Sequence, residues 1–98
     1  MIKRRKITGT TIVKVSFVIA ADDGRLPASV VGDFNEWDPT SDPFRRRSNG
    51  TASAVVSLQT GASYRFRYRS ASGSWFDDDA ADGYEANEHG SHDGVVTL

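Results

Sequence analysis

The sequence predicts an all-β protein that folds as an antiparallel sandwich of about seven short strands. Three observations lead to this prediction. Apolar and polar residues alternate in several segments, Gly, Pro, Asn and Asp separate these segments, and no 11-residue window has helical periodicity. This combination is typical of an immunoglobulin-like sandwich, with a small barrel as the alternative.

Turns separate the expected strands along the chain. In chain order they cover residues 11–20, 28–32, 44–47, 51–58, 64–69, 75–76 and 94–98. Alternation predicts which side chains of the longer strands face the core, namely Val13, Val15, Phe17, Ile19, Ala52, Ala54, Val56 and Leu58.

The clearest alternation lies in residues 64–69, where aromatic and arginine side chains take turns. Successive side chains of a strand point to opposite faces, so we expect the aromatic residues inside and the arginines outside. The inward set is Tyr64, Phe66 and Tyr68, and the outward set is Arg65, Arg67 and Arg69. The basic run 45–47 is expected on an edge strand, where charges block unwanted pairing.

Composition limits the classes of function. The chain has 98 residues, 38% hydrophobic, which suits one domain with a single core; we expect a basic segment at 1–10 and the domain at 11–98. The absence of cysteine excludes disulfides, thiolate metal sites and a cysteine nucleophile, and is consistent with a cytoplasmic protein. No charge-free apolar segment follows the basic start, so neither an export signal nor a membrane span is predicted.

Charge is distributed unevenly along the chain. Residues 1–69 carry all 12 Lys and Arg, whereas residues 70–98 carry seven acidic residues and no basic one, although the net charge is only −1. We expect the acidic segment to fold back over the basic strands and to offset their charge at short range. A basic face for phosphate or nucleic acid is the alternative, which the small net charge disfavours.

A tight polar turn with two large aromatic residues follows the strand at 28–32. Gly32 ends that strand, and the Asp, Asn and Pro residues at 33–39 have strong turn chemistry. Phe34 and Trp37 are separated by polar residues, so periodicity does not place both in the core. We expect one of the two rings to face solvent.

Four segments together resemble a known family. They are Gly32-Asp33-Phe34-Asn35-Glu36-Trp37, residues 64–68, Gly73-Ser74-Trp75 and Asp93-Gly94-Val95-Val96. They look like the glycogen-recognising early-set domains, also called the family 48 carbohydrate-binding module. That family includes N-terminal domains of isoamylases and branching enzymes, and the glycogen-binding domain of the AMP-activated protein kinase beta subunit. The resemblance covers residues 11–98 and implies an early-set, immunoglobulin-like sandwich.

The resemblance also implies a binding site. In glycan-binding members two tryptophans form a sugar platform, and the motifs place these at Trp37 and Trp75. A basic residue and an asparagine supply hydrogen bonds, at the positions of Arg65 and Asp93. The kinase-subunit domains have lysine at the first position, and Asp93 lacks the NH₂ donor of an asparagine. A flat indole suits the C–H face of a pyranose ring, with polar side chains pairing to its hydroxyl rim.

The sequence gives little support for metal binding or catalysis. Asp77 to Asp79 with Asp82 lack the spacing and glycine of a calcium loop, and a solvated acidic turn is the preferred interpretation. His89 and His92 have no third nitrogen ligand for zinc. No placed carboxylate pair is evident for glycoside hydrolysis, so we expect no enzyme, no catalytic residue and no metal or other cofactor.

The predicted function is therefore a non-catalytic module that binds α-1,4-linked glucan, such as glycogen, starch or malto-oligosaccharides. The alternative is an interaction module of the same fold that docks on an amylolytic or kinase-like partner without glycan affinity, and a glycogen-metabolising enzyme is the expected partner. A single-stranded nucleic acid partner is disfavoured, because the aromatics and arginines of 64–69 face opposite sides. A membrane partner is not expected.

Overall fold

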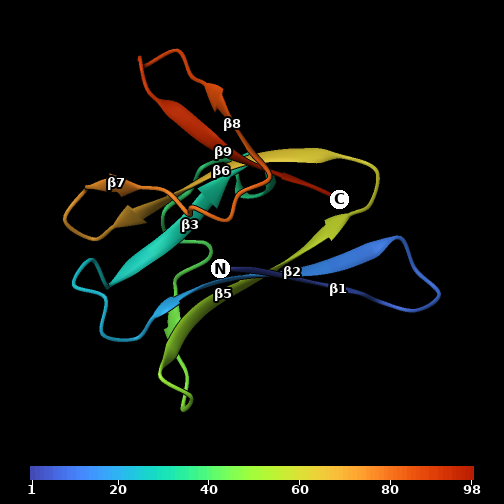
Figure 1. Cartoon of the computed structure of the whole chain (residues 1–98), viewed down its shortest axis with the longest axis horizontal. Coiled ribbons are helices and arrows are strands. Elements are labelled where there is room, and N and C mark those ends of the chain that lie inside the picture. The colour runs from blue at the N-terminus through green and yellow to red at the C-terminus, as the bar shows by residue number, and fades with distance from the viewer.

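The computed structural model describes residues 1–98 and confirms an all-β antiparallel sandwich, compatible with an immunoglobulin-like early-set fold (Figure 1). Its elements are β1 (Ile2–Lys6), β2 (Ile12–Ala20), β3 (Ala28–Gly32), the 3₁₀ turn η1 (Asp33–Asn35), β4 (Arg45–Arg46), β5 (Thr51–Gln59), β6 (Ser63–Ser70), β7 (Trp75–Phe76), β8 (Gly83–Ala86) and β9 (His92–Thr97). No helix has the length and apolar character needed to cross a membrane.

Two sheets form the two layers that Figure 1 separates. The first sheet has the strand order β1-β2-β5-β4, and the second has the order β3-β6-β9-β8, with the short β7 pairing with β6. Every pairing is antiparallel. The two-residue β4 lies at the edge of the first sheet, as the basic run 45–47 predicted.

The core lies between the layers and follows the predicted alternation. The inward positions of β2 and β5 are buried except Ile19, which is partly buried and packs against the core. The rings of Phe17 and Phe66 lie 4.9 Å apart between centroids, and Tyr68 packs 5.8 Å from Phe66. Phe17 belongs to the first sheet and Phe66 and Tyr68 to the second, so burial of these apolar rings stabilises the packing of the two sheets.

Two strands were not predicted. Four of the five residues of β1 are basic, so no apolar alternation marks it, and β8 lies between the expected strands 75–76 and 94–98, within the acidic segment. Both lie at sheet edges. An edge strand needs only backbone pairing on one side and tolerates charge, which explains why hydrophobic patterning missed them.

The acidic C-terminal segment folds back over basic strands, as the charge distribution predicted. Arg65 pairs with Glu85 at 2.7 Å, and Arg67 pairs with Asp77 at 2.9 Å. Residues from the two ends of the chain also meet, because Arg4 pairs with Asp82 at 2.6 Å. These pairs fix the 77–93 segment against β6 and β1.

Candidate functional site

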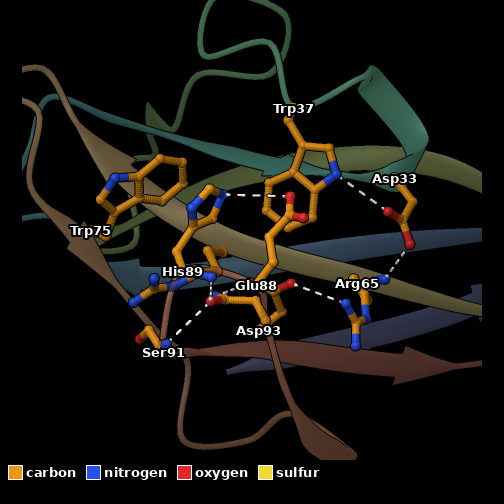
Figure 2. A pocket seen from close by; sticks show the side chains of 10 residues that line it. Asp33, Trp37, Arg65, Trp75, Glu88, His89, Ser91 and Asp93 are labelled. Atoms are coloured by element: carbon orange, nitrogen blue, oxygen red, sulfur yellow. Dashed lines mark hydrogen bonds and ion pairs between the residues drawn. The ribbon is translucent and has the colours of Figure 1, made fainter.

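A groove of about 900 Å³ lies on the outer face of the second sheet (Figure 2). Its lining comes from the turn after β3, from β6, from β7 and from the β8–β9 hairpin, and consists of Asp33, Trp37, Arg65, Arg67, Trp75, Asn87, Glu88, His89, Ser91 and Asp93. The four residues named from the sequence, Trp37, Trp75, Arg65 and Asp93, thus meet in one groove although they lie on four separate segments.

Trp37 is held at one end of the groove by an unusual backbone turn. Glu36 and Trp37 both have φ of 57°, in the left-handed region, and the Trp37 N–H donates to the Gly32 carbonyl at 3.0 Å. Asn35 stabilises this turn because its amide donates to the Val30 carbonyl and its oxygen accepts from the Gly32 N–H, each at 3.0 Å. The Trp37 residue is half-buried, so it is neither a core plug nor fully exposed.

Gly32 is required for this turn by close packing. A Cβ at this position would lie 2.4 Å from the Arg65 carbonyl oxygen and 2.8 Å from the Phe34 ring. Phe34 itself packs inward, with its ring 6.0 Å from that of Phe17. Of the two aromatics of the turn, Phe34 therefore joins the core, and Trp37 turns toward the groove.

Asp33 links the Trp37 ring to strand β6. Its Oδ1 accepts a hydrogen bond from the Trp37 indole N–H at 3.2 Å, and its Oδ2 accepts from the Arg65 backbone N–H at 2.9 Å. One carboxylate thus fixes the indole relative to the sheet (Figure 2). The sequence placed Asp33 in the turn but did not identify this role.

Trp75 begins β7 opposite Arg69, and 42% of its surface is exposed. The guanidinium of Arg69 lies 4.8 Å from the centre of the indole, and that of Arg67 lies 5.5 Å from it. Arg67 is held in turn by Asp77. Cation–π attraction between these groups stabilises the orientation of an otherwise exposed ring.

Arg65 is engaged within the protein. Its Nε and Nη2 donate to Glu85 at 2.9 and 2.7 Å, and its Nη1 lies 3.6 Å from an oxygen of Asp93. The hydrogen bond to Glu85 raises the pKa of the Arg65 guanidinium. The group is still 37% exposed, so it can contact a ligand while these pairs persist.

Asp93 lies beneath the groove. It is the second residue of β9, whereas the sequence predicted that the last strand begins one residue later, at 94, and its side chain is only 8% exposed. Its Oδ1 accepts from the Asn87 amide at 3.0 Å. Asp93 therefore contacts Asn87 and Arg65 more than it contacts solvent.

The β8–β9 loop closes the groove from one side. The Asn87 side-chain oxygen accepts from the backbone N–H groups of His89 and Ser91, at 2.9 and 3.1 Å. Figure 2 shows the His89 side chain between the two indoles, next to Glu88. Sequence reasoning did not assign this loop to the site, although the Asn and Gly residues of 87–90 are a hairpin signal that pointed to it.

No cluster of three or more His, Cys, Asp or Glu side chains has the arrangement of a metal site. The acidic residues considered for calcium bind elsewhere instead: Asp77 pairs with Arg67, Asp82 pairs with Arg4, and Asp78 accepts a hydrogen bond from the Tyr68 hydroxyl at 2.7 Å. Burial and the Asp78 carboxylate raise the pKa of Tyr68 above its ordinary value.

The chain is similar to segments of 1,4-alpha-glucan branching enzymes. It is 41% identical to the enzyme of Nitrobacter hamburgensis over 69 residues, which is 69% of this chain and 10% of that enzyme. It is 44% identical to an enzyme of two strains of Xanthomonas campestris pv. campestris over 60 residues, which is 60% of this chain and 8% of those enzymes. The chain thus matches at most a tenth of these relatives' length. No family model matches the chain.

Proposed function

We propose that this chain is a non-catalytic module that binds α-1,4-linked glucan in the groove of the second sheet. The observation that supports the proposal most is the meeting of Trp37 and Trp75 in one groove with paired donors and acceptors between them. The similarity to segments of enzymes named for 1,4-alpha-glucan agrees with this ligand.

The chemistry of the groove suits an uncharged polyol. Each indole can cover the C–H face of a glucose unit, which contributes about 1–3 kcal/mol when the contact is well buried. Two such contacts correspond to dissociation constants in roughly the micromolar to millimolar range. Such affinity is sufficient for a module that binds a polymer with many equivalent sites.

Arg65 and Asp93 have different tasks in this proposal. Arg65 donates to sugar hydroxyls from its exposed edge, while Glu85 keeps the guanidinium in place. Asp93 is nearly buried and supports Asn87 and Arg65 from below. The missing NH₂ donor at position 93 is offset only if the Asn87 loop supplies polar groups to the sugar.

Titration with maltoheptaose tests the proposal directly. We expect saturable changes in tryptophan fluorescence and in the indole N–H chemical shifts of Trp37 and Trp75. Trp37→Ala and Trp75→Ala should each abolish measurable binding while the domain remains folded by circular dichroism. Tyr84→Ala is the matched control, because Tyr84 is also an exposed aromatic of this sheet, 47% exposed, but does not line the groove. Unchanged indole signals at millimolar sugar would exclude glucan binding in this groove.

A second function is favoured by the engagement of Arg65 with Glu85 and Asp93, which reduces the donors available to sugar. In this alternative the chain is an interaction module that docks on an amylolytic or kinase-like enzyme. Recovery of such an enzyme in a pull-down, without retention of the chain on an amylose column, selects the alternative.

A further inference from the structure

The outer face of the first sheet, on the layer opposite the groove, is strongly basic. The four strands β1, β2, β5 and β4 contain seven Lys and Arg residues and no acidic residue. Among the residues of β1 and β2 that alternate with the core-facing set, Lys3, Arg5 and Lys14 are exposed. At the other edge, Arg45 of β4 and the following Arg47 are exposed as well. We call these five residues the basic face.

The cations of the basic face have no acidic partner. None of Lys3, Arg5, Lys14, Arg45 and Arg47 takes part in an ion pair. The inward neighbour Arg4 differs, because it pairs with Asp82 at 2.6 Å. The acidic C-terminal segment therefore neutralises arginines of the second sheet and Arg4 at the edge of the first sheet. The positive charge of the basic face is not neutralised.

Two of these cations repel each other in the folded domain. Arg5 lies directly opposite Lys14 in the antiparallel pairing of β1 with β2. Like charges directly opposite each other across two strands are destabilising. An anionic surface against this face would remove that cost, so the charge pattern is complementary to carboxylates of a partner.

The centre of the face is small and partly apolar. Ser16 lies between Lys3 on β1 and Val55 on β5, and Val55 is 44% exposed. No aromatic side chain belongs to the outward set of these strands. Single-stranded nucleic acids bind through aromatic stacking, so this face lacks their usual platform. Val55 thus offers one apolar contact inside a charged rim, and protein interfaces place apolar contacts inside a polar rim.

We propose that the basic face docks an acidic protein surface, one whose rim carries Asp and Glu side chains. The face lies on the opposite sheet from the glucan groove, so both surfaces can be occupied together. Electrostatic complementarity of this kind acts mainly on the association rate and on the choice of partner, and it weakens with salt.

The test compares two double variants of β1 and β4, in which neighbouring residues that face opposite sides of the sheet are changed to glutamate. A short poly-L-glutamate peptide is the probe, and binding is followed by chemical shifts at low salt. We expect shift changes on β1, β2 and β5, and binding weakened about tenfold in Arg5→Glu/Arg45→Glu. Lys6→Glu/Arg46→Glu makes the same change of charge on the other side of β1 and β4, and should weaken binding less than about twofold.

Lys14→Glu separates the effect of this residue on peptide binding from its effect on the stability of the domain. It places opposite charges across β1 and β2, so we expect a domain at least as stable as the wild type that binds the peptide several-fold more weakly. Maltoheptaose binding should stay unchanged in all these variants, so failure at the basic face is distinguishable from failure of the proposed glucan site.

Three results would overturn the proposal. The first is equal weakening in both double variants, which would mean that binding follows net charge and not this face. The second is binding of a thymidine oligonucleotide of equal charge at the same face as tightly as the peptide, which would indicate a nucleic acid. The third is salt-sensitive self-association of the wild type that Arg5→Glu/Arg45→Glu abolishes, which would identify a second copy of the chain as the occupant.

Discussion

Removal of the Asp33 carboxylate should weaken glucan binding without unfolding the domain. In Asp33→Ala the Trp37 indole loses its hydrogen bond at 3.2 Å, and the Arg65 N–H loses its acceptor at 2.9 Å. Trp37 must then be immobilised by the sugar itself, which costs about 0.5–1.5 kcal/mol for one side chain. That cost corresponds to an affinity about 2- to 12-fold weaker.

The matched control is Asp38→Ala, which removes the same charge from the same turn. The Asp38 carboxylate accepts hydrogen bonds from the Thr40 backbone N–H at 2.9 Å and from its hydroxyl at 2.7 Å, and it has no bond to the Trp37 indole. Affinities are measured by calorimetry with maltoheptaose, and the mobility of Trp37 by fluorescence anisotropy in a Trp75→Phe background. If Asp33→Ala and Asp38→Ala weaken binding equally, or if the Trp37 anisotropy does not fall in Asp33→Ala, Asp33 does not position the ring.

Three further changes test contacts that stabilise the fold. Gly32→Ala should destabilise the domain by about 3 kcal/mol in urea unfolding, because its Cβ meets the Arg65 carbonyl at 2.4 Å, whereas Gly24→Ala, with open space around it, should be nearly neutral. Tyr68→Phe should cost about 1.5–3 kcal/mol, because the hydroxyl donates to the buried Asp78 carboxylate; Tyr64→Phe, whose hydroxyl bonds at the surface, should cost clearly less, and equal losses would contradict this account. The hydrogen bond from Arg25 lowers the pKa of Asp23 from 3.8 to about 2, so this pair stabilises the fold above about pH 4 and its contribution disappears as the pH falls through about 2. The difference in unfolding free energy between wild type and Asp23→Asn should be at most about 1 kcal/mol at neutral pH, since the Arg25 side chain is 52% exposed, and a difference as large at pH 2 as at neutral pH would refute the assignment.

The core of this fold was predictable where a strand alternates between buried and exposed faces, as β2 does. Val13, Val15 and Phe17 alternate with polar residues, and such a period of two has no other stable arrangement than a half-buried strand. Strand β8 carries no such signal, since its residues Glu85 and Ala86 are exposed and only β9 specifies its place. The position of an edge strand is set by backbone hydrogen bonds to its neighbouring strand. A local stretch of sequence does not encode those bonds.

The residues that meet in the groove were predictable as a set, but the bonds among them were not. The motifs named Trp37, Trp75, Arg65 and Asp93, and the groove contains all four. The bonds of Asp33 to the indole and to β6 depend on the left-handed backbone at Glu36 and Trp37, which no local preference of those residues predicts. The burial of Asp93 likewise follows from the pairing of β8 with β9, which apolar alternation did not predict because β8 is mostly exposed.

Charge pairing separates the two proposed surfaces by the kind of ligand that each can hold. In the groove, Arg65 is matched by Glu85 and Asp93, and Arg67 is matched by Asp77, so donors and acceptors are present without a large net field. Such a surface suits a neutral ligand, because a sugar hydroxyl both donates and accepts. On the basic face no carboxylate compensates Arg5 and Lys14, and the repulsion between them persists until a partner supplies one. A glucan would leave that repulsion in place, so the two faces of the sandwich are expected to bind different classes of molecule.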